Sequence, residues 1–157
     1  MEDMSARAFV REPGAGSRLN ILGGTHIYKA TAAETGGSFS LWEAVFPPGE
    51  GPPPHTHSRE DEAFYVLEGE FVFDFEGAEG SRRLGPGGFF FGARGRRHGL
   101  RNAGETPGRL LILSAPSVGL DEMFAEIDAA GARRRPDLAT IMAITARYGV
   151  TVEPPPA

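Results

Sequence analysis

The sequence contains no cysteine, and this absence limits the kinds of site that the chain can carry. A disulfide, a thiolate metal ligand and a cysteine nucleophile are all excluded. Any metal site must therefore use histidine and carboxylate ligands, and the chain has only four histidines. Lysine is also scarce, since Lys29 is the one lysine among 16 basic residues, but we give the arginine excess little functional weight.

A positive net charge and long hydrophobic runs are missing as well. The net charge is -5 at pH 7, which argues against nucleic acid or an anionic membrane as a partner. The N-terminal stretch MEDMSARAFV lacks the hydrophobic segment of a signal peptide, and no run approaches about 18 apolar residues. We therefore expect a soluble, cytoplasmic protein whose partner is a small molecule, with no nucleic-acid or membrane partner.

The length of 157 residues predicts one domain covering residues 1–157. We expect an N-terminal arm over residues 1–19, a barrel over about 20–115 and a helical segment over about 119–149. The barrel region consists of short β-type runs between glycines and prolines: HIYKAT, SFSLWEAVF, EAFYVLE, EFVFDFE, GGFFFG, HGLRN and RLLILSA. Such spacing is typical of a β-sandwich or barrel, and the missing helical runs argue against a parallel sheet.

Two features of the sequence refine this outline. Phe71, Phe73 and Phe75 alternate onto one face of a strand, and Gly69 stands where a tight turn would join this strand to the preceding one. After the barrel, apolar residues recur at helical spacing and predict a helix ending near Gly131: Leu120, Met123, Phe124 and Ile127. A second helix is expected from a first-turn Pro136 to Tyr148, with Gly149 as its C-cap.

The segment PPPHTHSREDEAFYVLEGE combines the residues that carry chemistry. His55 and His57 are two positions apart, so they point to the same side of a strand. Glu62 shares its strand face with Phe64 and Val66, which we expect inside the barrel. An ionised carboxylate is costly there unless positive charge meets it, and two imidazoles with a divalent cation would do so.

A third histidine, His98, follows in a later run, where His98, Leu100 and Asn102 alternate onto one face. Three neutral imidazoles and one carboxylate suit one divalent transition metal ion, which can be Fe, Mn, Ni, Co or Zn. The same residues are also consistent with a barrel that binds metal loosely or uses these side chains only as hydrogen-bonding groups.

These residues resemble the cupin superfamily. The spacing Gly49-x5-His55-x-His57-x4-Glu62-x6-Gly69 matches the first cupin motif at every defined position. Spacing to Gly69 favours Glu62 as the carboxylate ligand over Glu60 and Asp61, which we expect to be solvated loop charges.

The second cupin motif is matched by Gly87-x5-Ala93-x-Gly95-x2-His98-x3-Asn102, except that Ala93 replaces the motif's proline. The wider sequence is similar to small single-domain bacterial cupins often grouped with quercetin 2,3-dioxygenases.

The resemblance implies a mainly β double-stranded β-helix, the cupin jelly-roll barrel, with two short C-terminal α-helices. It further implies a metal bound by His55, His57, Glu62 and His98, and a homodimer. For function it implies a dioxygenase of an enol- or phenol-type small molecule. We expect Glu62 to be the catalytic residue, which would accept the substrate's proton if it detaches from the metal or binds it only weakly. The alternatives are a small-molecule binding or sensing module and a non-oxidative decarboxylase or isomerase.

The remaining conspicuous residues receive structural interpretations. His26 belongs to neither motif and is expected at the surface or a strand edge, and Trp42 is open to either a core or a pocket role. Phe89–Phe91 are expected in the core or a dimer face. The clustered arginines are expected on the solvated surface: Arg94, Arg96, Arg97 and Arg133–Arg135.

Overall fold

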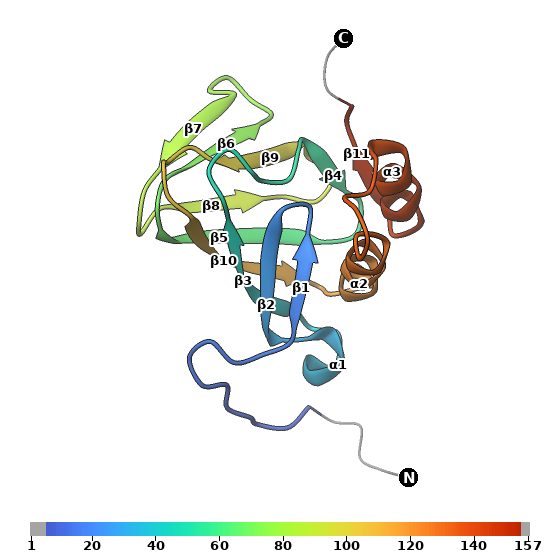
Figure 1. Ribbon diagram of the computed structural model, residues 1–157. Coiled ribbons are helices and arrows are strands. Elements are labelled where there is room, and N and C mark those ends of the chain that lie inside the picture. The colour runs from blue at the N-terminus through green and yellow to red at the C-terminus, as the bar shows by residue number, and fades with distance from the viewer. Residues whose placement is uncertain (1–5, 155–157) are drawn as a thin grey trace.

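The computed structural model describes residues 6–154, so the first five residues of the predicted arm and the last three of the chain lie outside it. Two antiparallel sheets form the body of the molecule (Figure 1). The six-stranded sheet has the order β1-β2-β3-β10-β5-β8, and the five-stranded sheet has the order β11-β4-β9-β6-β7. This arrangement confirms the predicted jelly-roll fold.

The strands of the six-stranded sheet are β1 (Arg18–Ile21), β2 (Gly24–Ala30), β3 (Ser40–Phe46), β5 (Asp61–Glu68), β8 (Phe89–Gly92) and β10 (Gly108–Ala115). Those of the five-stranded sheet are β4 (His55–His57), β6 (Phe71–Phe75), β7 (Ser81–Leu84), β9 (His98–Asn102) and β11 (Val150–Val152). Each of the seven β-type runs in the sequence forms a strand. The runs do not include four strands: β1, β4, the polar and mostly exposed β7, and β11, which has only three residues.

Side chains that alternate along the strands fill the space between the sheets. Burial alternates without interruption along β3 and β10, and Trp42 and Leu110 are inaccessible or nearly so. Phe71 and Phe73 are fully buried, as their alternation predicted. Each such side chain contributes about 1.5–3 kcal/mol of hydrophobic stabilisation relative to an exposed position.

Two helices follow the barrel, α2 (Leu120–Ala130) and α3 (Leu138–Arg147). The buried face of α2 consists of the four residues that its sequence pattern predicted: Leu120, Met123, Phe124 and Ile127. The first turn of α3 differs from the prediction, because Asp137 is the N-cap and accepts a hydrogen bond from the Thr140 backbone. Pro136 therefore precedes the cap. The helix ends at Arg147 with Tyr148 as its C-cap, so Gly149 is not the cap itself but the next residue, with a φ of 75° that favours glycine.

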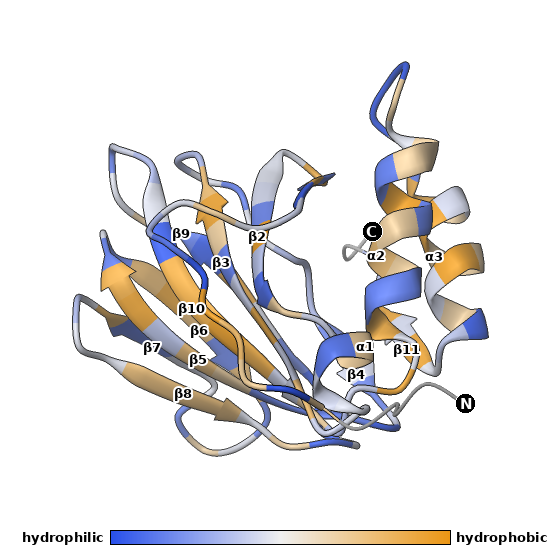
Figure 2. Cartoon of the chain, turned by 90° about the horizontal axis from the view of Figure 1, so that it is seen from below, coloured by the Kyte–Doolittle hydropathy of each residue, from blue (hydrophilic) through white to orange (hydrophobic). Residues whose placement is uncertain are grey.

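The C-terminal segment returns to the barrel. After α3, strand β11 pairs with β4 in antiparallel register, with Val150 opposite His57 and Val152 opposite His55. The two helices consequently lie at one end of the barrel, beside β4 and β11 (Figures 1 and 2). A third, short helix, α1 (Ala32–Thr35), connects β2 and β3.

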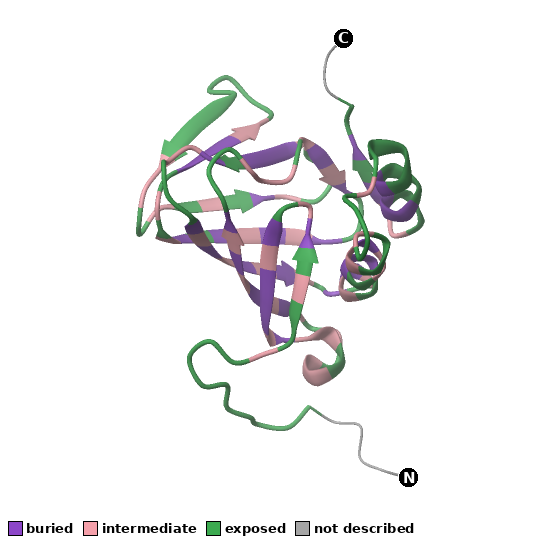
Figure 3. Cartoon of the chain, viewed as in Figure 1, coloured by how far each residue is buried: buried purple, intermediate pink, exposed green. Residues whose placement is uncertain are grey.

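One outer face of the barrel remains aromatic. Phe89 and Phe91 on edge strand β8 are 59% and 55% exposed, and Tyr65 on the neighbouring strand is 45% exposed. Phe90, between them, points inward and stacks on Phe73 with ring centroids 5.0 Å apart. Figure 3 shows the exposed strands β7 and β8 beside the buried barrel strands. Among residues 6–154, no helix is long and apolar enough to cross a membrane.

Candidate metal centre

The two sheets bring the four predicted ligands together inside the barrel. His55 on β4 pairs directly with His98 on β9, and His57 points inward two residues after His55. Glu62 approaches from β5 in the opposite sheet. All four side chains are buried, and one potential ligand atom from each lies within 4.8 Å of all the others.

The distances between these atoms fit a single ion. Oε2 of Glu62 lies 3.0 Å from Nε2 of His57 and 3.0 Å from Nε2 of His98. Nε2 of His55 is 3.7 Å from the same oxygen. Two ligands that are each about 2.1 Å from an ion and about 90° apart are separated by about 3 Å, so the donor set fits a divalent transition metal.

Backbone carbonyls fix two of the imidazole rings from behind. Nδ1 of His55 donates to the carbonyl oxygen of Pro53 at 2.8 Å, and Nδ1 of His98 lies 3.4 Å from the carbonyl oxygen of Arg96. A carbonyl oxygen only accepts hydrogen bonds, so these contacts assign the ring proton to Nδ1 and leave the Nε2 lone pair free for an ion.

Glu60 fixes the third ring, and here the sequence interpretation was wrong. Glu60 was expected to be a solvated loop charge, but it is fully buried and its Oε2 lies 3.3 Å from Nδ1 of His57. The turn between β4 and β5 folds Glu60 back onto the histidine three residues earlier. Asp61 does behave as a solvated charge and pairs with the exposed Arg94.

Replacing Glu60 with glutamine is expected to weaken divalent metal binding by about 10-fold, because a neutral amide orients and polarises the His57 ring less well than a carboxylate. Zn²⁺ titration against a chromophoric chelator measures this change. Asp61→Asn is the matched control and should bind as the wild type does. Equal affinity in all three proteins would show that Glu60 does not support the ligand.

The charges around the site stabilise one another. Burial by itself would lower the pKa of His57, but the Glu62 and Glu60 carboxylates outweigh it and raise the pKa to about 10. Burial would likewise raise the pKa of Glu62, yet the nearby His57 charge and the close contacts of its carboxylate with the three imidazoles hold that pKa well below its ordinary value. The pKa of His55 is lowered, mainly by burial. Glu62 is therefore ionised over the physiological pH range.

Gly92 leaves the room that the His98 ring occupies. A Cβ at this position would lie 2.8 Å from Cε1 of His98 and 3.0 Å from its Nδ1. Gly92→Ala is therefore expected to displace the ring and lower metal affinity by about 10-fold or more, since a ligand moved by even a fraction of an ångström binds less well.

The same chelator titration measures the Gly92 effect, with Gly85→Ala as control, because a Cβ at Gly85 meets nothing within 4 Å. Unchanged affinity together with unchanged thermal stability in Gly92→Ala would mean that the His98 ring has more freedom than the structure indicates.

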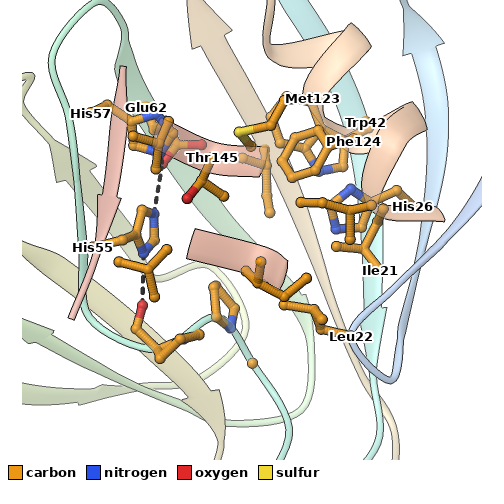
Figure 4. Close-up of a pocket in the computed structure, with 18 of the residues that line it drawn as sticks. Ile21, Leu22, His26, Trp42, His55, His57, Glu62, Met123, Phe124 and Thr145 are labelled. Atoms are coloured by element: carbon orange, nitrogen blue, oxygen red, sulfur yellow. Dashed lines mark hydrogen bonds and ion pairs between the residues drawn. The ribbon is translucent and has the colours of Figure 1, made fainter. Parts of the chain in front are cut away.

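A pocket opens beside the candidate metal ligands, and its volume is about 750 Å³ when the open solvent at its mouth is included. One end is formed by His55, His57 and Glu62, and apolar side chains form most of the remaining wall. That wall comes from the barrel and from the C-terminal segment: Trp42, Phe64, Met123, Phe124, Ile127 and Ile141. Figure 4 shows Thr145 and Met123 between the two ends.

His26 lines this pocket, contrary to the prediction that it lies at the surface or a strand edge. Its side chain is 4% exposed and contacts Trp42 and Phe124, with ring centroids 5.7 Å and 4.8 Å away. Burial lowers the pKa of His26 from 6.5 to about 3, although the negative charge of Glu62 opposes the shift. The imidazole is therefore neutral at physiological pH. Trp42, which the sequence left open, also lines the pocket.

The low pKa of His26 predicts a specific acid sensitivity. Between about pH 3 and 6.5 the unfolded chain protonates this histidine and the folded protein does not, so the free energy of unfolding falls as pH drops, by up to about 1.4 kcal/mol per pH unit. Urea unfolding of chelator-treated wild type and His26→Phe from about pH 6.5 to 5 should show a slope smaller by about 1 kcal/mol per unit in the variant. Parallel curves would contradict the assignment.

Most of the expected surface arginines lie at the surface, whereas Arg97 is partly buried. Arg94 and Arg96 are exposed and pair with carboxylates, and Arg133–Arg135 are exposed beyond α2. None of them lines the pocket that His55, His57 and Glu62 line, but Arg96 and Arg97 line a second cavity beside His98.

Comparisons with known proteins agree with this architecture. Residues 42–114 match the family model for the cupin domain. KdgF from Halomonas sp. is 26% identical, with a TM-score of 0.58 over 68% of this chain and 92% of that chain. A predicted oxalate decarboxylase from Thermotoga maritima is 25% identical, with a TM-score of 0.59 over 69% of this chain and 99% of that chain.

An RmlC-like cupin from Shewanella frigidimarina shares the fold at 22% identity, with a TM-score of 0.59 over 73% of this chain and 95% of that chain. No curated protein sequence matches this chain significantly. The fold, the domain match and these neighbours together support a small cupin with a possible metal site at His55, His57, Glu62 and His98.

Proposed function

We propose that this chain is a metal-dependent cupin enzyme that acts as a dioxygenase on an enol- or phenol-type small molecule. The observation that carries the proposal is a buried three-histidine, one-glutamate ligand set at the end of an apolar, aromatic-lined pocket. Four protein ligands leave up to two positions on an octahedral ion for other molecules. The donor set suits Fe, Mn, Ni, Co or Zn.

A divalent ion held by these residues supplies Lewis acidity, which lowers the pKa of a substrate hydroxyl. The chain supplies the remaining functions. His55, His57 and His98 bind through Nε2 and are oriented by their Nδ1 contacts. The apolar walls exclude water and orient a flat ring.

Glu62 is the carboxylate that lines this pocket. It would accept the substrate's proton when it is detached from the ion or only weakly bound to it. Its pKa is held low, so it is a weak base that takes a proton only from an acidified hydroxyl.

Non-oxidative chemistry, either decarboxylation or isomerisation, is the second candidate. It is favoured by the similarity to the structure described as a predicted oxalate decarboxylase, at 25% identity. The pocket of this chain argues against a small dianion such as oxalate, because its wall beyond the metal ligands is mainly apolar and lined by no arginine or lysine. A desolvated dianion would need such partners.

Oxygen uptake tests the proposal. Wild-type protein loaded with Fe, Mn, Co or Ni is mixed with flavonols, acireductones and β-diketones in an oxygen electrode, beside Glu62→Gln. We expect uptake that depends on one of these substrates and is lost in the variant. Turnover under strict anaerobiosis would instead identify non-oxidative chemistry, and a ligand recovered unchanged would identify a binding or sensing module.

We also propose that the chain forms a homodimer through the aromatic face of Tyr65, Phe89 and Phe91. These side chains are exposed beside the edge strand β8, and an exposed apolar strand edge favours pairing with a second copy. Light scattering at tens of micromolar should give twice the chain mass for the wild type and the monomer mass for Phe89→Glu/Phe91→Glu. A monomeric wild type would refute the dimer.

A further inference from the structure

The end of the pocket opposite the metal ligands carries two polar atoms without partners. Nδ1 of His26 and Nε1 of Trp42 are buried, and neither has a hydrogen-bond partner in the part of the chain that the structure describes. Both side chains line the same pocket as His55 and Glu62. Figure 4 shows His26 and Trp42 across the pocket from His55, His57 and Glu62.

Buried polar groups in proteins are nearly always hydrogen-bonded, because an unpaired one keeps its desolvation cost. A single unpaired polar atom within a tightly packed core would only lower the stability of the fold. Here two such side chains stand together, with ring centroids 5.7 Å apart, and both line a pocket whose wall is mainly apolar. A bound molecule is therefore the natural source of their partner.

The position of His26 in the chain points to a specificity role. The cupin domain match covers residues 42–114 and so includes all four metal ligands. His26 on β2 precedes the matched region, and Phe124, which packs edge-on against its ring, follows it on α2. The metal end of the pocket is thus built by the shared domain, and the far end mainly by segments outside it.

We propose that His26 and Trp42 form a second binding subsite, which takes a hydroxyl group at the far end of a flat aromatic ligand whose first oxygen lies at the metal ligands. This inference rests on the proposed function for the position of the first oxygen. The indole N–H of Trp42 donates only, and a neutral imidazole both donates and accepts, so a hydroxyl can satisfy both. The low pKa of His26 keeps the ring uncharged, which disfavours a carboxylate in this place.

The simplest ligands of this kind are flat fused-ring molecules that carry an oxygen at each end. Naphthalene-2,6-diol, with one oxygen at each end, and 2-naphthol, with one oxygen only, form a matched pair of probes.

The test measures the dissociation constants of both naphthols on protein loaded with Zn²⁺, which is redox-inactive and prevents oxidative turnover. Quenching of naphthol fluorescence gives the constants for the wild type and for His26→Phe, which keeps a flat ring and removes the nitrogens. We expect the wild type to bind the diol about 10-fold more tightly than 2-naphthol, beyond the twofold factor from the diol's symmetry. In His26→Phe the preference should fall to about that twofold factor.

A wild type that binds both probes with similar affinity, or binds neither, would overturn the subsite. So would a preference that persists in His26→Phe. Trp42→Phe is expected to halve or abolish the preference for the diol over 2-naphthol. It is the second variant if His26→Phe folds poorly. Because affinity is measured without turnover, a protein that shows the preference but consumes no oxygen refutes only the dioxygenase. Oxygen consumption without the preference refutes only the subsite.

Discussion

Protein carrying Glu62→Gln is expected to lose divalent metal affinity by about 100-fold or more. Oxygen Oε2 of Glu62 is the atom on which the three imidazoles converge, at 3.0 Å from two of them and 3.7 Å from the third. The amide removes the one negative charge that the site offers a cation, and losing a direct ligand should cost more than the roughly 10–100-fold typical of residues that only orient ligands.

Elemental analysis of the purified proteins and a chelator titration together measure the loss. Glu70→Gln is the matched control, because Glu70 is exposed and pairs with Arg83 at the surface. Wild type and control should each bind about one ion per chain. Full occupancy in Glu62→Gln would show that the carboxylate is not a ligand, and metal retained by His55→Ala/His57→Ala would contradict the ligand assignment as a whole.

Asn102→Leu is expected to destabilise the fold by about 3 kcal/mol, at roughly 1 kcal/mol for each of three hydrogen bonds. Asn102 is 1% exposed. Its amide nitrogen donates to the carbonyl oxygens of Phe46 and Thr106, both at 2.8 Å, and its oxygen accepts from the Gly104 backbone at 2.8 Å. The residue thereby holds the loop after β9 against the end of β3.

Urea unfolding monitored by tryptophan fluorescence measures this change in the free energy of unfolding. Asn20→Leu is the control, because Asn20 is an exposed residue on β1. A loss below about 1 kcal/mol in Asn102→Leu would mean that the three bonds are replaced by other contacts or by water.

The grouping of the candidate metal ligands could be predicted in part, because the placement of three of them follows from the geometry of single strands. His55 and His57 point the same way because successive side chains alternate, and Glu62 shares its face with Phe64 and Val66 for the same reason. That His98 meets them depends on pairing between β4 and β9, which the motif spacing implied and the residues alone did not.

Two functional neighbours were missed because their surroundings come from distant parts of the chain. His26 is buried because the rings of Trp42 and Phe124, from β3 and α2, pack against it, and burial along β2 does not alternate cleanly enough to reveal this. Glu60 is buried by the path of a turn, which residue type and spacing do not specify. For His26, the only sequence signal was its position within a mainly apolar strand. For Glu60, it was its position three residues after His57.

Anomalous diffraction from crystals of the metal-loaded protein tests the central claim most directly. The account predicts one strong peak per chain, within about 2–2.3 Å of Nε2 of His55, His57 and His98 and of a Glu62 oxygen. Absence of a peak at saturating metal, or a peak bound by other residues, would contradict it.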